Sequence, residues 1–123
     1  MLPKAILIAD DHPHILKLVE FSLEEINCWI EPASSGEEAL EKAAKVHIDL
    51  LVIDVKLPGI DGFETIRRMK AQTGYADLPV IILSGQGHGE LRDRARGLGV
   101  AAFMTKPFSP IELAAKARKL LDL

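Results

Sequence analysis

The sequence predicts an α/β fold: a doubly wound parallel sheet of five strands covered by helices on both faces. Five short apolar runs alternate with five stretches that carry helix signals, and alternating strand–helix units imply a parallel sheet. The runs at 48–53 and 79–83 are almost continuously apolar, which is typical of strands buried on both faces. Because no linker, repeat or low-complexity stretch interrupts the 123 residues, we expect one domain over 1–123, with no output domain.

The first third of the chain contains two predicted strands and one predicted helix. KAILIA at 4–9 is a short continuous apolar run. Over 14–26, apolar residues recur at helical spacing from Ile15 to Ile26, which predicts an amphipathic helix. A weaker strand candidate follows at 28–33.

The middle third repeats this alternation. Ser35 is followed three residues later by Glu38, a spacing typical of a capping box, and predicts the start of the second helix. The third strand is predicted at 48–53. Asp61 and Glu64 repeat the cap spacing and predict the start of the third helix.

The last third completes the pattern with two more units. A strand at 78–83 precedes a helix at 91–98, whose end is marked by glycines. A fifth strand is predicted at 100–105. SPIE at 109–112 places Pro at the first helical position, so we expect the last helix to run from there almost to Leu123.

Composition excludes several classes of function. A net charge of −3 and an aromatic content of 5% argue against nucleic-acid binding. No stretch of 18 apolar residues is present, and the apolar run at the start is too short for a signal peptide, so we expect no membrane association. The single cysteine, Cys28, excludes an intramolecular disulfide and fits a cytoplasmic protein.

Polar side chains follow four of the five predicted strands. Asp10 and Asp11 follow the first strand, Asp54 the third, Ser84 the fourth and Lys106 the fifth. Ligands of open α/β sheets bind outside the carboxyl ends of the strands, and in the strand order 2-1-3-4-5 the first and third strands are neighbours. We therefore expect three carboxylates in one crevice, with a hydroxyl and an ammonium beside them.

This set of groups favours phosphoryl chemistry. Three close carboxylates resist ionising together, and a divalent cation such as Mg²⁺ removes that penalty. A cation together with Lys106 and the Ser84 hydroxyl would then bind one dianionic group. Asp54 would be the nucleophile that forms an acyl phosphate. Each residue alone also fits a plain role, because an Asp after a strand is often a cap or a turn former and a lone Lys is often a surface residue.

Four segments together resemble a response regulator receiver domain. They are ILIADDHP at 6–13, DLLVIDVKLPGIDGFE at 49–64, PVIILSG at 79–85 and FMTKPF at 103–108. The acid pair, the central Asp, the Ser and the Lys-Pro stand in the family's order and at about its spacing, and the resemblance covers the whole chain. It implies a flavodoxin-like fold with the strand order 2-1-3-4-5, an order known for such receivers.

The resemblance also implies a role for each acid. Asp54 matches the phosphorylated aspartate. Asp11 matches a direct ligand of Mg²⁺ (or Mn²⁺), and Asp10 matches an acid that acts through water. The backbone carbonyl of Lys56 would be a further ligand, and its side chain would place a second cation beside the site.

Four more positions match the family's switch and phosphoryl-binding residues. Ser84 matches the hydroxyl that moves toward the phosphoryl oxygen, and Lys106 matches the lysine that pairs with it. Pro107 resembles a proline that is preceded by a cis peptide bond. Phe103 matches the position of the family's switch aromatic, although it lacks the hydroxyl of the Tyr that many relatives carry. Alternatively, Phe103 is an ordinary aromatic residue of the core.

The expected function is that of a two-component phosphorelay receiver. A sensor histidine kinase or a histidine phosphotransfer protein would donate the phosphoryl group to Asp54, and a face at about 87–120 would bind a downstream protein target. We expect a monomer or weak dimer, with self-phosphorylation and self-dephosphorylation as its only catalysis.

Two alternatives come from other functional classes. The chain could be a receiver-like interaction module that is never phosphorylated, in which case Mg²⁺ binding would be absent. It could also be a small aspartyl-nucleophile phosphatase of the dehalogenase-like kind. That class needs Asp-x-Asp, and the sequence at 54–56 is Asp-Val-Lys.

Other motif-like features favour plain roles. GQGHGE at 85–90 resembles a dinucleotide-binding loop, but the last glycine arrives one residue early and no acid follows about 20 residues later. The scattered histidines are expected at the surface or at helix caps; they are His12, His14, His47 and His88.

Overall fold

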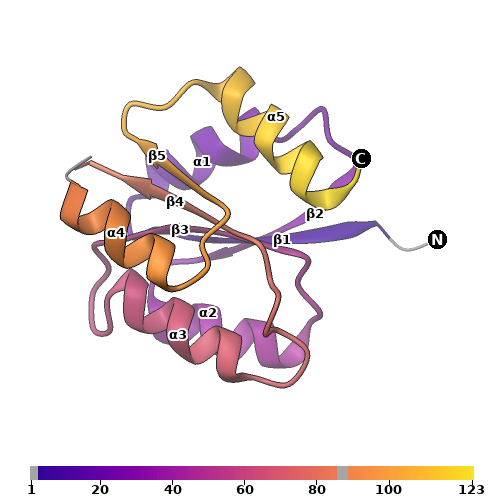
Figure 1. The fold of residues 1–123 in the computed structure, drawn as a ribbon. Helices are drawn as coiled ribbons and strands as arrows, with labels where there is room; N and C mark the ends of the chain where they lie inside the picture. The colour runs from indigo at the N-terminus through magenta and orange to yellow at the C-terminus, as the bar shows by residue number, and fades with distance from the viewer. Residues whose placement is uncertain (1–2, 86–88) are drawn as a thin grey trace.

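The computed structural model describes residues 3–85 and 89–123 and contains a single five-stranded parallel sheet of order β2-β1-β3-β4-β5 (Figure 1). The predicted strand order is therefore confirmed. The strands are β1 (Lys4–Ala9), β2 (Cys28–Ala33), β3 (Leu50–Asp54), β4 (Val80–Ser84) and β5 (Ala102–Thr105). The helices are α1 (Pro13–Ser22), α2 (Gly36–Lys45), α3 (Gly62–Ala71), α4 (Gly89–Gly97) and α5 (Pro110–Leu121).

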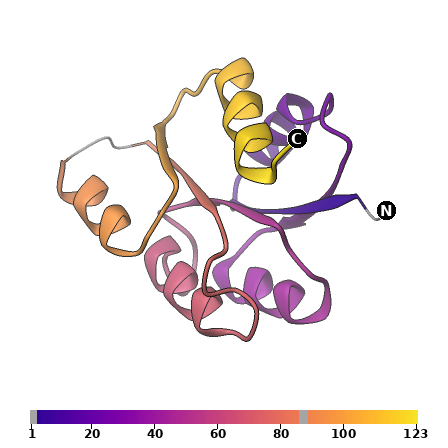
Figure 2. The same ribbon diagram turned by 45° about the vertical axis from the view of Figure 1, so that its right-hand side comes forward.

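The helices form two layers, one on each face of the sheet. Helices α1 and α5 cover one face, and α2, α3 and α4 cover the other (Figures 1 and 2). The alternation of side chains along a strand divides the interior between these layers. In β3, Leu51 and Ile53 pack into the core beneath α2 and α3, whereas Leu50 and Val52 pack beneath α1 and α5. This explains why the central strands are apolar at every position before their carboxyl ends.

Hydroxyl and carboxylate caps begin three of the helices. Glu38 N–H donates to Ser35 Oγ at 3.0 Å, and Glu64 N–H donates to Asp61 Oδ1 at 2.8 Å. The cap of α5 has the same form at Ser109. All three starts were predicted from their spacing. Each cap satisfies an amide that has no partner within its own helix.

The predicted end of the first helix is wrong. The helix was expected to reach Ile26, but α1 ends at Ser22, whose Oγ donates to Leu18 O at 2.7 Å. Leu23 and Ile26 are nevertheless buried against the same core. The apolar spacing continues beyond the helix because the turn that follows also faces the interior.

Three strands begin later than predicted, because burial at a strand's start does not require ladder pairing. Ile48 is 1% exposed, yet its N–H donates to the Tyr75 hydroxyl at 3.0 Å and lies outside β3. Leu78 N–H bonds to Tyr75 O in a turn before β4. Val100 N–H bonds to Ala95 O and closes the end of α4, so β5 begins only at Ala102.

A close backbone approach fixes the loop after β3. Gly62 N–H donates to Val55 O at 2.8 Å, and a Cβ at Gly62 would lie 2.3 Å from Asp54 O. Only glycine allows this approach. The start of α3 is thereby packed directly against the end of β3, where Asp54 lies.

Among the helices that the structure describes, none combines the length and the apolar character needed to cross a membrane.

Candidate functional site

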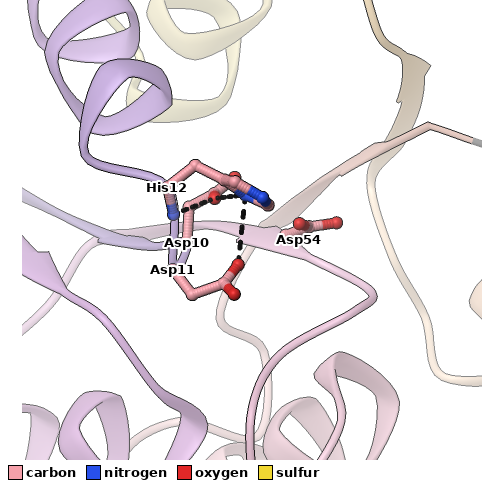
Figure 3. A group of neighbouring side chains, drawn as sticks. All are labelled: Asp10, Asp11, His12 and Asp54. Atoms are coloured by element: carbon pink, nitrogen blue, oxygen red, sulfur yellow. Dashed lines mark hydrogen bonds and ion pairs between the residues drawn. The ribbon is translucent and has the colours of Figure 1, made fainter.

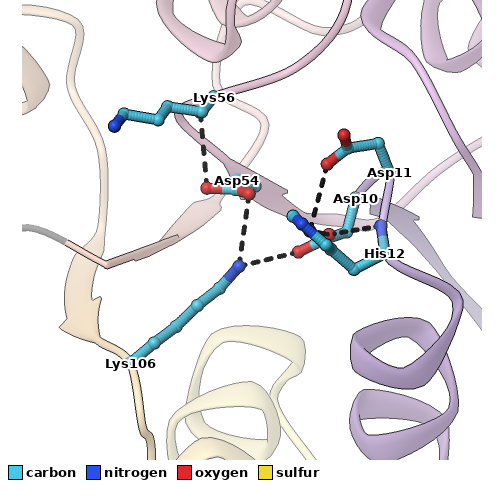
Figure 4. A network of polar contacts seen from close by, with 6 residues as sticks. All are labelled: Asp10, Asp11, His12, Asp54, Lys56 and Lys106. Atoms are coloured by element: carbon cyan, nitrogen blue, oxygen red, sulfur yellow. Dashed lines mark hydrogen bonds and ion pairs between the residues drawn. The ribbon is translucent and has the colours of Figure 1, made fainter.

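The polar residues predicted at the strand ends meet at the carboxyl edge of the sheet. Asp54 and Ser84 are the last residues of β3 and β4, while Asp10 and Lys106 directly follow β1 and β5. Figure 4 shows Asp10, Asp54 and Lys106 close together at this edge. Because β1 and β3 are neighbours, the acids that end them face each other. Asp10, Asp54 and Ser84 are at most 5% exposed, so their polar groups lie inside the rim of the sheet.

Lys106 joins the two buried acids. Its Nζ donates to Asp10 Oδ2 at 3.0 Å and to Asp54 Oδ2 at 3.2 Å. Figure 4 shows the side chain reaching across the rim to both carboxylates. The ammonium offsets part of the repulsion between two acids held in a poorly solvated place.

Burial and the neighbouring charges shift the pKa values of this pair in the same direction. Burial raises the pKa of Asp54 above 3.8; the Lys106 ammonium opposes this and the Asp10 carboxylate adds to it. For Lys106, burial favours a lower pKa, but the hydrogen bonds and charges of Asp10 and Asp54 outweigh burial and raise the pKa above 10.5. Lys106 therefore stays charged at neutral pH.

The acid pair after β1 comes close to Asp54 and gathers around a histidine. His12 Nδ1 lies 3.0 Å from Asp10 Oδ1 and 3.1 Å from Asp11 Oδ1 (Figure 3). One donor atom from each of Asp10, Asp11, His12 and Asp54 can be chosen so that all lie within 4.8 Å of one another. Carboxylate oxygens are the ligands that Mg²⁺ and Mn²⁺ prefer, so this donor set fits such an ion.

A cleft opens above these residues. It has a volume of about 400 Å³ and is lined by His12, Asp54, Val55, Lys56, Ser84, Gly85, Leu91 and Lys106. Asp54 is the acid that lines it, and Leu91 of α4 contributes an apolar wall. A phosphoryl group is small enough to enter a cleft of this size and reach the Asp54 carboxylate.

Lys56 contributes its backbone to the site. Its N–H donates to Asp54 Oδ1 at 3.3 Å, so the carboxylate is held from both sides, by this amide and by Lys106. In Figure 4 the Lys56 side chain extends away from Asp10 and Asp11. The second cation predicted beside the site thus lies at the edge of the cleft.

The remaining predicted residues lie around β4 and β5. Ser84 is buried, and its carbonyl accepts a 2.7 Å hydrogen bond from Lys106 N–H. Phe103 is half-buried beneath the guanidinium of Arg92, 4.7 Å from the ring centre. The peptide bond between Lys106 and Pro107 is cis, the form that the resemblance implied.

The contact of His12 with the acids was missed by sequence reasoning. His12 is the exposed N-cap residue of α1, as expected for a scattered histidine, but its ring also faces Asp10 and Asp11. Its position directly after the acid pair was the available signal. His88 and the middle of the GQGHGE stretch lie outside the described residues.

The sequence comparisons identify one family and several longer relatives. Residues 6–118 match the family described as the response regulator receiver domain. The chain is 38% identical over 120 residues to response regulator GtcR of Aneurinibacillus migulanus, covering 98% of this chain and 48% of GtcR. It is also 38% identical to the alkaline phosphatase synthesis transcriptional regulatory protein PhoP of Bacillus subtilis, with 96% and 48% covered. The chain thus spans about half the length of these curated relatives.

Solved structures show the same fold. A putative response regulator from Chloroflexus aurantiacus superposes with a TM-score of 0.91 at 32% identity, covering 98% of this chain and 99% of that one. Chemotaxis protein CheY4 of Vibrio cholerae superposes with a TM-score of 0.90 at 28% identity, covering 97% and 99%. With the family match and the shared fold in view, this chain belongs to the response regulator receiver domains of two-component systems.

Proposed function

We propose that Asp54 accepts a phosphoryl group from a phosphohistidine of a sensor histidine kinase or a histidine phosphotransfer protein. The observation that carries this proposal is the position of Asp54: a buried carboxylate on the floor of an open cleft, oriented by Lys106 and by the Lys56 amide. A purely structural acid at this place would have no need of a cleft.

The transfer requires an ionised Asp54. A carboxylate oxygen of Asp54 forms the new P–O bond as the P–N bond to the donor imidazole breaks. The bonding electron pair leaves with the imidazole, which then takes a proton from water. Lys106, already 3.2 Å from Asp54 Oδ2, neutralises charge on the arriving phosphoryl oxygens, because this reaction depends mainly on positioning and electrostatics.

Asp10, Asp11 and Asp54 would hold Mg²⁺ (or Mn²⁺), with the backbone carbonyl of Lys56 as a further ligand. When bound, the metal supplies positive charge that offsets the phosphoryl oxygens. Two of the acids keep their positions through contacts already present: Asp10 through Lys106 and Asp54 through the Lys56 amide. Asp11, which is exposed, can turn toward the ion.

Phosphorylation would shift the β4–α4–β5 region between two states. The Ser84 hydroxyl would bind the phosphoryl group, and Phe103 would turn inward behind it. The affected face, about 87–120, would then bind a protein target. Since PhoP is named a transcriptional regulatory protein and both relatives are about twice as long as this chain, that target is either a separate protein or a further domain of the same polypeptide.

The proposal is tested by intact-mass measurement after incubation with acetyl phosphate, with and without Mg²⁺. We expect one phosphoryl adduct in the wild type that requires Mg²⁺ and is absent from Asp54→Asn. Asp77→Asn is the matched control, because Asp77 is an exposed acid outside the cleft, and it should form the adduct normally.

An adduct that survives in Asp54→Asn would exclude Asp54 as the acceptor. If the wild type forms no adduct and binds no Mg²⁺, the chain is an interaction module and the proposal is wrong.

A further inference from the structure

We propose that His12 is a metal-selecting residue: its Nδ1 provides a nitrogen ligand that makes the acid cluster favour a borderline divalent ion such as Co²⁺, relative to Mg²⁺. The inference rests on the proposed function, because it concerns the ion that the same acids would hold. It goes beyond that function by assigning a role to a residue of this chain that the oxygen ligands of Mg²⁺ do not require.

The first argument is the spacing of the donor atoms. Two ligands at right angles on an octahedral ion, with metal–ligand bonds of about 2.1 Å, lie about 3.0 Å apart. His12 Nδ1 lies 3.0 Å from Asp10 Oδ1 and 3.1 Å from Asp11 Oδ1. Asp54 provides another oxygen within 4.8 Å of all three. The nitrogen is thus already at coordination spacing from two carboxylate oxygens.

The second argument is where the ring is held. Asp10 Oδ1 also accepts the His12 backbone N–H at 2.9 Å, so the backbone turn itself brings the ring over the acids. Figure 3 shows the ring beside the Asp10 and Asp11 carboxylates, with Asp54 next to them. Its side chain is 53% exposed, and it also lines the cleft, so both a hydrated ion and water can reach it.

The third argument is ligand chemistry. Mg²⁺ takes oxygen ligands and keeps several waters, so coordination by His12 would increase the affinity of the site for Mg²⁺ only slightly. Imidazole suits first-row transition ions, and their affinity for a nitrogen-containing site rises along the series from Mn²⁺ to Cu²⁺. In the metal-bound form Nδ1 offers its lone pair and the ring proton lies on Nε2. Replacing one bound water by this nitrogen would therefore favour Co²⁺ and leave Mg²⁺ nearly unaffected.

The test uses the untagged full chain and calorimetric titration with Co²⁺ and Mg²⁺ separately. We expect His12→Ala to raise the Co²⁺ Kd by about tenfold or more, the size of effect seen when a residue that supports a bound metal is removed. The Mg²⁺ Kd should change less than about threefold. His12→Gln keeps a hydrogen-bonding group beside the acids but removes the imidazole, and it should match His12→Ala. His14→Ala is the control, because His14 is an exposed histidine two residues away and outside the donor cluster.

A direct readout comes from ¹H NMR of the Co²⁺ form. A coordinated imidazole gives an exchangeable N–H resonance far outside the diamagnetic range; this resonance should vanish in D₂O and in His12→Ala and persist in His14→Ala. Its absence from the wild type, or an equal loss of Co²⁺ and Mg²⁺ affinity in both His12 variants, would overturn the inference.

The acetyl phosphate adduct separates the two proposals. If the His12 variants still form the Mg²⁺-dependent adduct on Asp54 while the wild type lacks the shifted resonance, metal selection fails and the acceptor function stands. If the wild type forms no adduct, the acceptor function fails whichever ions bind.

Discussion

The two ends of the sheet both carry polar side chains, but the partners of those side chains differ. At the amino end, Asp49 Oδ2 accepts Ala5 N–H at 2.8 Å, and the buried Tyr75 hydroxyl bonds to backbone groups. At the carboxyl end, Asp10 and Asp54 each accept one backbone N–H, from His12 and Lys56, but their other oxygens bond to the side chain of Lys106. An oxygen bonded to the backbone cannot change its partner without disturbing the fold, whereas one bonded to another side chain can exchange that partner for a ligand.

Cavity size alone would point to the wrong end. A larger cavity than the cleft, about 660 Å³, lies at the amino end beside Trp29 and Asp49. The cleft above Asp54 is about 400 Å³. The larger cavity is mostly apolar, and its acids are engaged by Ala5 N–H, the Trp29 indole and a lysine. Two buried carboxylates that share one lysine, rather than volume, distinguish the candidate site.

The largest effect is expected at the amino end of the sheet, from the substitution Tyr75→Phe. The hydroxyl accepts Ile48 N–H at 3.0 Å and lies 2.8 Å from Ala43 O, so its loss leaves buried backbone groups unpaired. We expect a loss of about 2 kcal/mol and a fall in Tm of about 8 °C, measured by circular dichroism. Adduct formation on Asp54 below the transition should be unchanged. A variant with the same Tm as the wild type would show that the Tyr75 hydroxyl does not stabilise the amino end of the sheet.

The next effect concerns exchange at the carboxyl end. Lys106→Met removes the ammonium that competes with a divalent ion for Asp10 and Asp54. We expect Mg²⁺ to bind about fivefold more tightly, equivalent to about 1 kcal/mol, although phosphorylation should be impaired. Calorimetric titration measures this. Lys42→Met, which removes a lysine paired with Glu31 away from the site, should leave the Mg²⁺ Kd unchanged. Weaker Mg²⁺ binding in Lys106→Met would mean that the lysine organises the acids rather than competing at them.

A smaller effect is expected from the free energy that it costs to keep the buried Asp54 ionised. Because the pKa of Asp54 is raised in the folded protein, the folded state holds the proton more tightly than the unfolded state. Ionised Asp54 therefore costs stability above its folded pKa and nothing below about 3.8. Without metal, Asp54→Asn should raise Tm by a few degrees at pH 7, and the gain should shrink as the pH falls through the raised pKa. A gain that grows toward low pH would contradict the direction of the shift.

The smallest effect compares two arginines of α4. Arg92 lies 4.7 Å from the centre of the Phe103 ring, and Arg94 lies 4.2 Å from that of Phe63. Removing either should cost below about 1 kcal/mol, since both guanidinium groups are exposed. Only Arg92→Ala should change how far the Phe103 ring signals move in NMR spectra on phosphorylation. Equal changes in both variants would remove Phe103 from the proposed switch.

Much of the fold was predictable because local signals agreed with the tertiary structure. The capped helix starts at Ser35, Asp61 and Ser109 follow from short-range hydrogen bonds that the sequence itself encodes. Strand and helix ends were less predictable. Leu23 is buried in a turn and Ile48 bonds to a distant tyrosine, and both depend on contacts that local spacing does not contain.

The residues of the candidate site could be predicted from the sequence, but the contacts between them could not. The positions of Asp10, Asp54, Ser84 and Lys106 at strand ends follow from the alternation of strands and helices. That Lys106 joins both acids, and that the His12 ring turns back over the acid pair, depends on side-chain directions at the rim. The direction of Lys106 is set by the assembled sheet, whereas the His12 ring is positioned by a turn in which Asp10 Oδ1 also accepts the His12 backbone N–H.

The bridge made by Lys106 also has a consequence for synthesis. Its partner Asp10 lies 96 residues earlier in the chain, and β5, which positions the lysine, is the last strand to leave the ribosome. A nascent chain that ends before β5 can form β1 and β3 but leaves their acids facing each other without a cation. Under the proposed function, the two acids would therefore gain their lysine partner only after nearly all of the domain has been made.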